Sequence, residues 1–357
     1  MDPAILKVEL LCLGARLEED IDKGRRGGAG AAGGRYLILP ENIYVNTPLQ
    51  GDFVSRSPFK LSKTAEGWML FRGGEPLVGV ELLSTPKFYE KYTSDGLPMW
   101  KIALLHGRDC LASTVYQRCY YWQLGKPCKF CAVELSADLG LTIEVKSPSQ
   151  LAETALEAVR EKVASHVTLT TGTPGTPDKG AILLAEATKA IKERSGLPVH
   201  VQLEPTHDLR YLDILAEAEV DTVGIHIETF DKKALAENCP MKRDSESFFR
   251  AWREAVKLFG EAQVSSYIIA GLGETKQSIL EGAETLARMG VVPFLVPLRP
   301  LLGTPLARSS PPTPSEMLTL YEATSEILAK YGLDPRKNKA GCVRCGCCSA
   351  LNEFYKT

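Results

Sequence analysis

A repeated alternation of short apolar runs and amphipathic segments constrains the fold of this chain more than any other feature. Six apolar runs have the length of β-strands, and they cover residues 112–117, 166–171, 199–203, 221–227, 264–269 and 291–296. Each precedes a segment with helical periodicity, and these segments cover residues 149–163, 179–194, 208–217, 245–259, 275–289 and 315–331. Short apolar strands between amphipathic helices indicate a parallel sheet with helices outside it. The sequence therefore predicts an α/β fold, a partial (β/α)6 barrel of the TIM type, with its chemistry at the C-terminal ends of the strands.

The rest of the chain lies on either side of this barrel, which we place at residues 101–332. Residues 1–100 contain short β-like runs separated by turns and prolines, which predicts a small β-rich N-terminal module. Its segment 24–34 lacks the Gly-Lys-Ser/Thr ending of a phosphate-binding loop, so we interpret it as a flexible loop. Residues 333–357 form a cysteine-rich tail. The module either caps the active site or binds a partner, and the sequence leaves both roles open.

Charge and composition exclude several classes of protein. The net charge is -2 with the signs mixed, so no basic face indicates nucleic-acid binding. No apolar run approaches the ~20 residues of a membrane helix. The N-terminus has neither the basic start nor the cleavage site of a signal peptide, so we expect a cytoplasmic protein. Ten cysteines in a reducing compartment indicate metal or redox sites rather than disulfides.

The first cysteine cluster lies in residues 118–134, RCYYWQLGKPCKFCAVE, directly after the first predicted barrel strand. It contains Cys119, Cys128 and Cys131. Three cysteines this close can bind one face of a four-iron cluster and leave the fourth iron open for another ligand. The alternative is a zinc knuckle. We favour iron because no histidine or fourth cysteine lies nearby in the sequence.

The second cysteine cluster lies in the tail. Cys342, Cys345 and Cys348 have the ferredoxin-like spacing Cys-x2-Cys-x2-Cys, with Cys347 as an alternative ligand. We predict a second iron–sulfur cluster there, in preference to zinc or to an inert or redox-regulated tail. The other three cysteines stand alone in the sequence and are interpreted as small buried hydrophobic residues: Cys12, Cys110 and Cys239.

Polar residues follow the ends of the predicted strands. The segment Thr170-Thr171-Gly172-Thr173 offers hydroxyls and carbonyls that can accept hydrogen bonds from an ammonium group, although a plain turn has the same composition. Glu204 and Glu228 end the third and fourth strands and can bind ribose hydroxyls or an amine. His226 alternates with apolar residues in its strand, so we interpret it as structural.

Later turns offer backbone groups and guanidinium groups. Gly271, Gly273 and Glu274 lead from the fifth strand into its helix. Arginine fits carboxylates with two parallel hydrogen bonds, so Arg243 or Arg253 can bind a ligand carboxylate, and Arg299 can hold an anionic substrate group. Alternatively, Arg243 and Arg253 are surface cations, and Arg299 belongs to a rigid Pro/Gly loop.

Taken in order, these motifs resemble the radical S-adenosylmethionine (SAM) superfamily over residues 112–305, and the biotin synthase and lipoyl synthase-like branch in particular. The chain keeps the family's Cys-x2-Cys pair and its aromatic residue, as Cys128-Lys-Phe-Cys131. It departs from the family in the first gap, since eight residues rather than three separate Cys119 from Cys128. Residues 170–173 resemble the family's Gly-Gly-Glu-Pro segment, and residues 271–275 match its Gly-x-Gly-Glu-Thr turn.

The resemblance implies cofactors and chemistry. A [4Fe–4S] cluster on Cys119, Cys128 and Cys131 is expected to cleave SAM reductively to a 5'-deoxyadenosyl radical, which removes a hydrogen from an unactivated carbon. Reduced ferredoxin or flavodoxin is the implied electron donor. The residues that the resemblance assigns to SAM are Thr170, Thr171, Gly172, Thr173, Glu204, Glu228, Arg243, Arg253, Gly271, Gly273 and Glu274.

The tail motif bears on the product. Biotin and lipoyl synthases take sulfur from a second cluster, so a second [4Fe–4S] cluster on the tail predicts sulfur insertion at C–H bonds. The resemblance implies an octanoylated, lipoyl-type carrier protein as substrate, with a second radical SAM protein as another partner. The alternatives are rearrangement, cyclisation or methylation of a small molecule, with the second cluster relaying electrons, and a non-catalytic cluster carrier.

Overall fold

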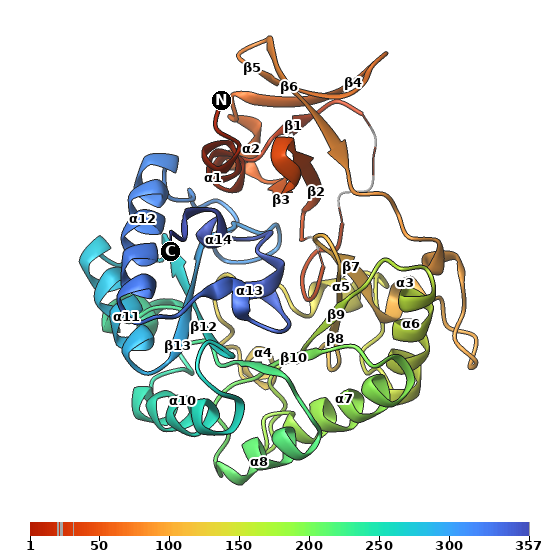
Figure 1. The fold of residues 1–357 in the computed structure, drawn as a ribbon, viewed down its shortest axis with the longest axis vertical. Helices are drawn as coiled ribbons and strands as arrows, with labels where there is room; N and C mark the ends of the chain where they lie inside the picture. The colour runs from red at the N-terminus through yellow and green to blue at the C-terminus, as the bar shows by residue number, and fades with distance from the viewer. Residues whose placement is uncertain (20, 22–23, 31, 357) are drawn as a thin grey trace.

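The computed structural model describes residues 1–19, 21, 24–30 and 32–356. Its larger sheet is an open barrel of seven strands in the order β13-β12-β11-β10-β9-β8-β7 (Figure 1). The six strands from β8 to β13 pair in parallel, which confirms the predicted partial (β/α)6 barrel. The short strand β7 adds an antiparallel edge that was not predicted. The strands are β7 (Leu104–His106), β8 (Cys110–Thr114), β9 (His166–Thr170), β10 (Val199–Gln202), β11 (Thr222–Gly224), β12 (Val264–Ala270) and β13 (Val291–Pro297).

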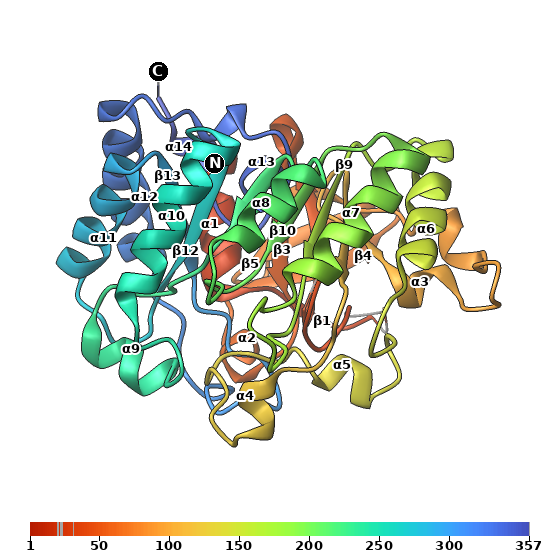
Figure 2. The same ribbon diagram turned by 90° about the horizontal axis from the view of Figure 1, so that it is seen from below.

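Helices cover the outside of this sheet, as Figure 2 shows from a second direction. They are α6 (Pro148–Arg160), α7 (Ala181–Ser195), α8 (Arg210–Glu217), α9 (Lys232–Asn238), α10 (Ser245–Phe259), α11 (Lys276–Arg288) and α12 (Pro314–Lys330). Capping boxes start two of them: Ser147 with Gln150 at α6, and Thr313 with Glu316 at α12. The short helix α9 was not predicted. Within the described residues, no helix is both long enough and apolar enough to cross a bilayer.

The barrel core lies between the strands and these helices. Every residue of β13 is buried, as expected for a parallel strand covered on both faces. Trp252 of α10 is fully buried, and its indole N–H donates to the Ile225 carbonyl at 2.9 Å. This bond fixes α10 against the loop that follows β11, and the same loop carries Glu228 into the site.

The N-terminal module is a second sheet, of six strands, in the order β1-β4-β5-β6-β2-β3. Its strands are β1 (Arg16–Leu17), β2 (Gly34–Leu39), β3 (Ile43–Pro48), β4 (Phe59–Thr64), β5 (Gly67–Arg72) and β6 (Glu75–Leu82). Helix α1 (Pro3–Leu13) joins the module to the end of the chain, because the buried Lys7 forms an ion pair with Glu353 at 2.8 Å. The remaining short helices are α2 (Asp52–Ser55), α3 (Met99–Ile102), α4 (Tyr120–Gln123), α5 (Leu135–Asp138), α13 (Cys342–Cys345) and α14 (Leu351–Phe354).

The glycine-rich segment 24–34, interpreted as a flexible loop, is packed against the barrel where the structure describes it; residue 31 lies outside the described residues. Arg25 is 3% exposed and donates to the Trp100 carbonyl at 2.7 Å. A Cβ on Gly27 would lie 2.0 Å from the Ala132 carbonyl oxygen. The glycines therefore allow this segment to approach the cysteine loop more closely than any side chain would permit.

The tail closes the end of the barrel at which the parallel strands begin. Thr222 at the start of β11 donates to the Ala340 carbonyl at 3.0 Å. The Gly341 N–H donates to His166 Nδ1, at the start of β9, at 3.1 Å. Beyond α13, the Cys347 carbonyl accepts the Asn46 N–H of β3 at 2.8 Å. Figure 1 shows α13 in front of the barrel strands, and these bonds fix the tail to the starts of β9 and β11.

Candidate functional site

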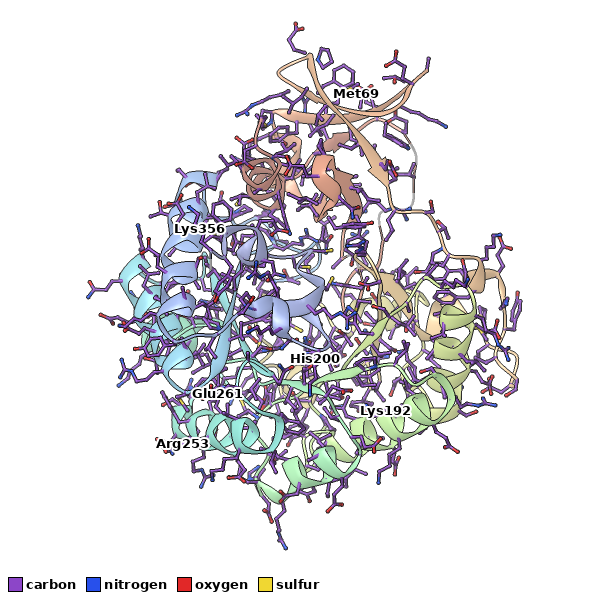
Figure 3. All side chains as sticks on the ribbon, in the orientation of Figure 1. Met69, Lys192, His200, Arg253, Glu261 and Lys356 are labelled. Carbon is purple, nitrogen blue, oxygen red and sulfur yellow. The ribbon has the colours of Figure 1, made fainter. Side chains whose placement is uncertain are left out.

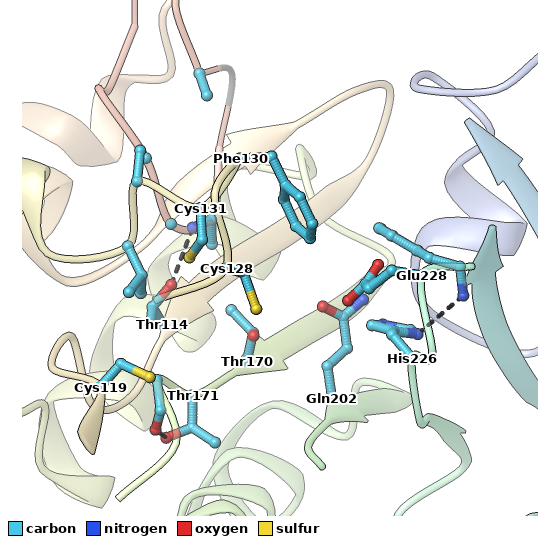
Figure 4. Close-up of a pocket in the computed structure, with 18 of the residues that line it drawn as sticks. Thr114, Cys119, Cys128, Phe130, Cys131, Thr170, Thr171, Gln202, His226 and Glu228 are labelled. Carbon is cyan, nitrogen blue, oxygen red and sulfur yellow. Dashed lines mark hydrogen bonds between the residues drawn. The ribbon is translucent and has the colours of Figure 1, made fainter. Parts of the chain in front are cut away.

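A cavity of about 420 Å³ lies inside the barrel. Three cysteines of the first cluster line it: Cys119, Cys128 and Cys131. Cys342 of the tail also lines it. Figure 4 shows the three thiols of the first cluster along one side of the cavity, with Gln202, His226 and Glu228 on the other. The fold thus brings Cys342 of the second cysteine cluster to the same internal space as the first cluster, although the two are far apart in the sequence.

Hydrogen bonds fix the backbone of the first cysteine loop. The Cys131 N–H donates to the Cys128 carbonyl at 3.0 Å, which makes a tight turn. The Cys119 N–H donates to a Glu134 carboxylate oxygen at 2.8 Å. Arg118 in turn pairs with Glu134 at 3.3 Å and with Asp138 at 2.6 Å. These contacts set the positions of the thiols before any ligand binds.

The surroundings of Cys119 and Cys131 favour their protonated thiols by raising the pKa of each. Burial raises the pKa of Cys119, and burial together with the charge of Cys128 raises the pKa of Cys131 to about 12. A bound cation is needed to hold such groups as thiolates. In the described part of the chain, no three Cys, His, Asp or Glu side chains converge on a point that one metal ion could occupy. The donor set itself, three thiols on one cavity, has the chemistry of an iron–sulfur site.

Cys239 lies beside this loop, although it stands alone in the sequence. It is fully buried, as predicted, and a hydrogen bond with Cys128 and burial both raise its pKa. The loop is also tied here through its backbone, since the Lys129 N–H donates to the Asn238 carbonyl at 2.9 Å. Cys239 therefore packs directly behind a predicted cluster ligand.

Thr170, which ends β9, and the three residues that follow it line the cavity: Thr171, Gly172 and Thr173. The Tyr120 N–H donates to the Thr173 carbonyl at 2.8 Å, so the segment is bonded to the cysteine loop. The Gly172 N–H donates to the Tyr116 carbonyl at 2.7 Å. A Cβ on Gly172 would lie 2.0 Å from the Arg118 carbonyl oxygen, so only glycine fits here.

We predict that Gly172→Ala will weaken SAM binding at least about tenfold. This factor corresponds to a cost of about 1.4 kcal/mol for moving the segment away from the added methyl group. The added methyl group meets a backbone carbonyl, and the hydrogen bonds on both sides prevent the segment from moving away. Gly79→Ala is the matched control, because a Cβ there meets nothing within 4 Å. Calorimetric titration with SAM on anaerobically reconstituted protein measures the difference. Equal affinities for the two variants would contradict the packing argument.

Glu204 and Glu228 both line the cavity, and a lysine that sequence reasoning missed lies between them. Lys242 Nζ is 2.8 Å from a Glu228 oxygen and 3.8 Å from a Glu204 oxygen. It also donates to the His226 carbonyl at 2.7 Å, and its side chain is 8% exposed. The Tyr121 hydroxyl donates to Glu204 at 2.5 Å. These groups form a buried charged network on the wall opposite the thiols.

Glu228 has an unusual backbone conformation. Its φ is +74°, in the left-handed region that a residue other than glycine rarely adopts. The backbone is held there by two bonds with β12: the Glu228 N–H donates to the Tyr267 carbonyl at 3.2 Å, and its carbonyl accepts the Ile269 N–H at 2.8 Å. Strain of this kind is kept where the surrounding structure fixes a functional side chain.

The two arginines expected to bind a carboxylate do not line the cavity. Arg243 is exposed, directly after the buried Lys242. Arg253 lies on the outer side of α10, where it is 58% exposed and 3.8 Å from Glu246 (Figure 3). The cations that do line the cavity, among the described residues, are Lys242 and Arg299.

The turn after β12 lies beside the cavity but not on its lining. Glu274 accepts the Gly271 N–H at 2.7 Å and the Leu272 N–H at 2.8 Å, so its carboxylate is used within its own turn. Gly271 has a φ of +107°, and a Cβ there would lie 3.1 Å from the Pro312 ring. Gly273 and Glu274, like Gly271, are not among the residues that line the cavity.

Arg299 lines the cavity, but its guanidinium group is bonded to the N-terminal module. It donates to Asn46 Oδ1 at 2.9 Å, to the Ala32 carbonyl at 3.2 Å and to the Asn46 carbonyl. The side chain expected to bind an anionic substrate group therefore joins the barrel to β3.

Three of the tail cysteines have polar partners on the barrel or the module. Gln202 donates to Cys342 Sγ at 3.2 Å, and Asn46 donates to Cys348 Sγ at 3.3 Å. Cys345 Sγ lies 3.7 Å from the His106 carbonyl. Burial raises the pKa of Cys348, but the hydrogen bond and charge of His106 outweigh it and lower that pKa to about 7. Cys347 differs, because it is buried among aromatic side chains and its thiol faces the Cys345 carbonyl at 3.5 Å.

We predict that Gly107→Ala will displace the tail cysteines. A Cβ on Gly107 would lie 2.4 Å from Cys347 Sγ and 2.5 Å from Cys345 Sγ. Gly196→Ala is a matched control, since Gly107 and Gly196 have φ values of +65° and +68° but Gly196 has nothing within 4 Å. We expect Gly107→Ala to lower the free energy of unfolding by about 1–3 kcal/mol more than the control, as overpacking does. Urea unfolding measures both, and equal losses would show that the tail moves aside freely.

Comparison with known proteins places this geometry in context. Residues 125–286 match the Radical SAM superfamily, a span that includes Cys128 and Cys131 and begins after Cys119. A lipoyl synthase of Thermus thermophilus is 30% identical over 208 residues, which cover 56% of this chain and 60% of the synthase. Bacteriochlorophyllide c C-7(1)-hydroxylase of Chlorobaculum limnaeum is 23% identical over 265 residues, 67% of this chain and 64% of the hydroxylase.

The solved structure of a methylornithine synthase aligns with a TM-score of 0.48 at 16% identity, over 63% of each chain. The chain spans less than two thirds of the length of the two sequence relatives. The match to the superfamily nevertheless covers the second part of the cysteine loop and the strands that carry Thr170–Thr173, Glu204, Glu228 and Gly271. Residues 125–286 therefore match the Radical SAM superfamily, and the chain is similar in sequence to lipoyl synthases.

Proposed function

We propose that this chain is a radical SAM enzyme that inserts sulfur at C–H bonds of an octanoyl chain carried on a lipoyl-type carrier protein. The observation that supports sulfur insertion is the position of Cys342, which lines the same cavity as the three cysteines of the first cluster. A sulfur source on the tail would then face the carbon from which hydrogen is removed. An electron relay alone would not need to reach the cavity.

The residues present fit the cofactors that this function requires. Cys119, Cys128 and Cys131 would hold the first [4Fe–4S] cluster, and the tail thiols would hold a second one. When bound, the first cluster and SAM supply hydrogen abstraction from an unactivated carbon, and the second cluster supplies sulfur. The protein's own contribution is to orient SAM against residues 170–173, Glu204 and Glu228, and to exclude water from an internal cavity.

The cavity wall between the two clusters is suited to an aliphatic chain. Apolar side chains of the strand ends and the following loops line it: Leu203, Ile269, Val296, Leu298 and Leu301. His226 stacks on Tyr267 with the ring centroids 4.1 Å apart, and its Nε2 has no hydrogen-bond partner among the described residues. This ring therefore adds a polar group next to these apolar side chains, and a mainly apolar lining with a few placed polar groups is typical of a small-molecule site.

Similarity to lipoyl synthases supports the octanoyl substrate, and a carrier protein and an electron donor such as reduced ferredoxin or flavodoxin follow from it. A cytoplasmic location and partnership with a second radical SAM protein are part of the same proposal. Similarity to a bacteriochlorophyllide hydroxylase supports the alternative, in which the radical chemistry serves another product and the tail cluster only relays electrons.

Incubation with an octanoylated carrier domain, SAM and a reductant tests the proposal. We expect mass spectrometry of the carrier to show the added mass of one sulfur atom for each C–H bond that becomes C–SH under these reducing conditions. Catalytic SAM cleavage with a product that contains no added sulfur would support the alternative. Absence of SAM cleavage under strong reductant would instead support a non-catalytic cluster carrier.

A further inference from the structure

A histidine that no motif indicated lies among the tail cysteines. His106 ends β7 and lines the central cavity. Its Nε2 is 3.8 Å from Cys348 Sγ, and its carbonyl is 3.7 Å from Cys345 Sγ. The imidazole thus reaches the tail cysteines from the β7–β8 turn, whereas Gln202 of β10 contacts Cys342.

The ring of His106 is held in one orientation. Its Nδ1 is 2.7 Å from the hydroxyl of Tyr36, a residue of β2 that is 5% exposed. The two rings also meet edge to face, with centroids 5.2 Å apart. A histidine that binds a metal usually has its second ring nitrogen fixed in this way by a hydrogen-bond partner. Because the Tyr36 hydroxyl is bonded to Nδ1, Nε2 is the nitrogen that faces the thiols.

Cys347 competes with His106 for the position of fourth ligand, and its environment is less suitable. Its thiol faces the Cys345 carbonyl at 3.5 Å, and its own carbonyl is bonded to Asn46. The side chain packs with Tyr36 and Tyr44, toward the N-terminal module. Cys348, in contrast, receives an N–H from Asn46 at 3.3 Å and lies next to the imidazole.

We propose that His106 Nε2 binds the tail iron–sulfur cluster together with Cys342, Cys345 and Cys348, and that Tyr36 positions its ring. This inference rests on the proposed function in one respect, that the tail holds a cluster. It adds a ligand from the barrel edge and a positioning residue from the N-terminal module. A neutral imidazole in place of a thiolate makes a cluster less negative and raises its reduction potential, as in clusters with mixed histidine and cysteine ligands. The module would then stabilise the cluster as well as cover the barrel.

The test isolates the tail cluster in the Cys128→Ala/Cys131→Ala variant of the full chain, reconstituted anaerobically with iron and sulfide and reduced with dithionite. Pulsed EPR is expected to show strong hyperfine coupling to an imidazole nitrogen, which shifts to the 15N pattern when only histidine is labelled. His106→Ala is expected to abolish this coupling. His106→Cys should retain iron, lose the coupling and lower the midpoint potential.

Matched variants complete the test. Cys347→Ala and His207→Ala, the latter at an exposed histidine, should leave the nitrogen coupling unchanged. Tyr36→Phe should retain iron and alter the coupling, because the ring loses its hydrogen bond. If the Cys128→Ala/Cys131→Ala protein binds iron but its spectrum shows no histidine coupling, the assignment of His106 as a ligand is overturned. The second cluster itself would still be supported. Absence of tail iron in the parent would overturn both proposals. Loss of iron in Cys347→Ala with retention in His106→Ala would assign the fourth ligand to Cys347.

Discussion

Replacing Cys128 and Cys131 with alanine is expected to abolish SAM cleavage, whereas replacing Cys345 and Cys348 is expected to leave SAM cleavage intact and remove sulfur transfer. Cys128 and Cys131 line the cavity, whereas Cys345 and Cys348 belong to the tail, whose Cys342 lines the same cavity, and the proposed chemistry divides between the two pairs. Loss of Cys128 and Cys131 removes two of the three thiols that we propose hold the open-iron cluster. Loss of Cys345 and Cys348 removes two ligands of the proposed sulfur source and leaves the residues proposed to bind SAM unchanged.

Iron and sulfide counting, 5'-deoxyadenosine release and mass analysis of the carrier separate these effects. We expect each double variant to lose about half of the iron, as two clusters of equal size require. Cys12→Ala controls for the loss of a buried cysteine, because Cys12 is 1% exposed and packs in the hydrophobic core against Val8 and other apolar residues. If the Cys345→Ala/Cys348→Ala variant still transferred sulfur at the normal rate, the tail could not be the sulfur source.

The barrel was predictable because each of its elements has a strong local signal. The barrel strands are continuous apolar runs, whereas in the helices apolar residues recur with the helical period, so the two kinds of element can be told apart in the sequence. The predicted ranges accordingly fall close to β8 through β13 and to six of the helices that follow these strands. Elements without such periodicity were missed. Helix α1 is apolar on most sides and has several fully buried residues, β7 has three residues, and β1 has two.

The predicted site residues divide according to how they reach the cavity. Parallel strands end at one rim, so Glu204 and Glu228 meet there by topology, as the sequence predicted. Lys242 and His106 reach the same cavity from a loop and an edge hairpin, and no period or spacing indicates that they do. Arg243 was predicted to bind a carboxylate in the site, because a guanidinium group suits carboxylates, but its side chain is exposed. Its neighbour Lys242 lines the cavity instead. The sequence does not show which of two adjacent side chains points into the barrel.

Composition misled the prediction at segment 24–34. Glycine and alanine suggest flexibility when no partner is known, but small residues are also those that pack closest to another backbone. Gly28 shows this, since a Cβ there would lie 2.4 Å from Gln117 Nε2. Close approach of this kind depends on the tertiary position of Gln117, which lies in the loop after β8, and no local pattern contains that information.

Replacing Lys242 with methionine is expected to destabilise the protein by about 3–5 kcal/mol, the typical cost of removing one partner from a buried ion pair. Methionine matches the length of the lysine stem but leaves Glu228, which is 9% exposed, without its cation at 2.8 Å. Lys257→Met is the matched control, because Lys257 pairs with Glu254 at the same distance of 2.8 Å while 70% exposed. Exposed pairs contribute little, so urea unfolding should separate the two variants clearly.

The pH dependence of the stability that Lys242→Met loses shows whether the lysine charge is the cause. Burial lowers the pKa of Lys242, but the charges of Glu228 and Glu204 outweigh burial and raise the pKa well above its ordinary value. A group with a raised pKa contributes its stability fully below the unfolded value, about 10.4, and loses it only as the pH rises through the folded value. The difference between Lys242→Met and wild type should therefore stay constant across neutral pH and shrink only in strong alkali.

A double variant distinguishes lost pairing from lost packing. Lys242→Met/Glu228→Gln removes both charges of the close pair, so we expect it to recover a large part of the stability that Lys242→Met loses. The same double variant should bind SAM poorly, because Glu228 is also a predicted ribose ligand. If Lys242→Met/Glu228→Gln were no more stable than Lys242→Met, the cost would lie in packing around the lysine stem. Recovered stability with poor SAM binding would support both lost pairing as the cause of the Lys242→Met effect and Glu228 as a group that contacts SAM.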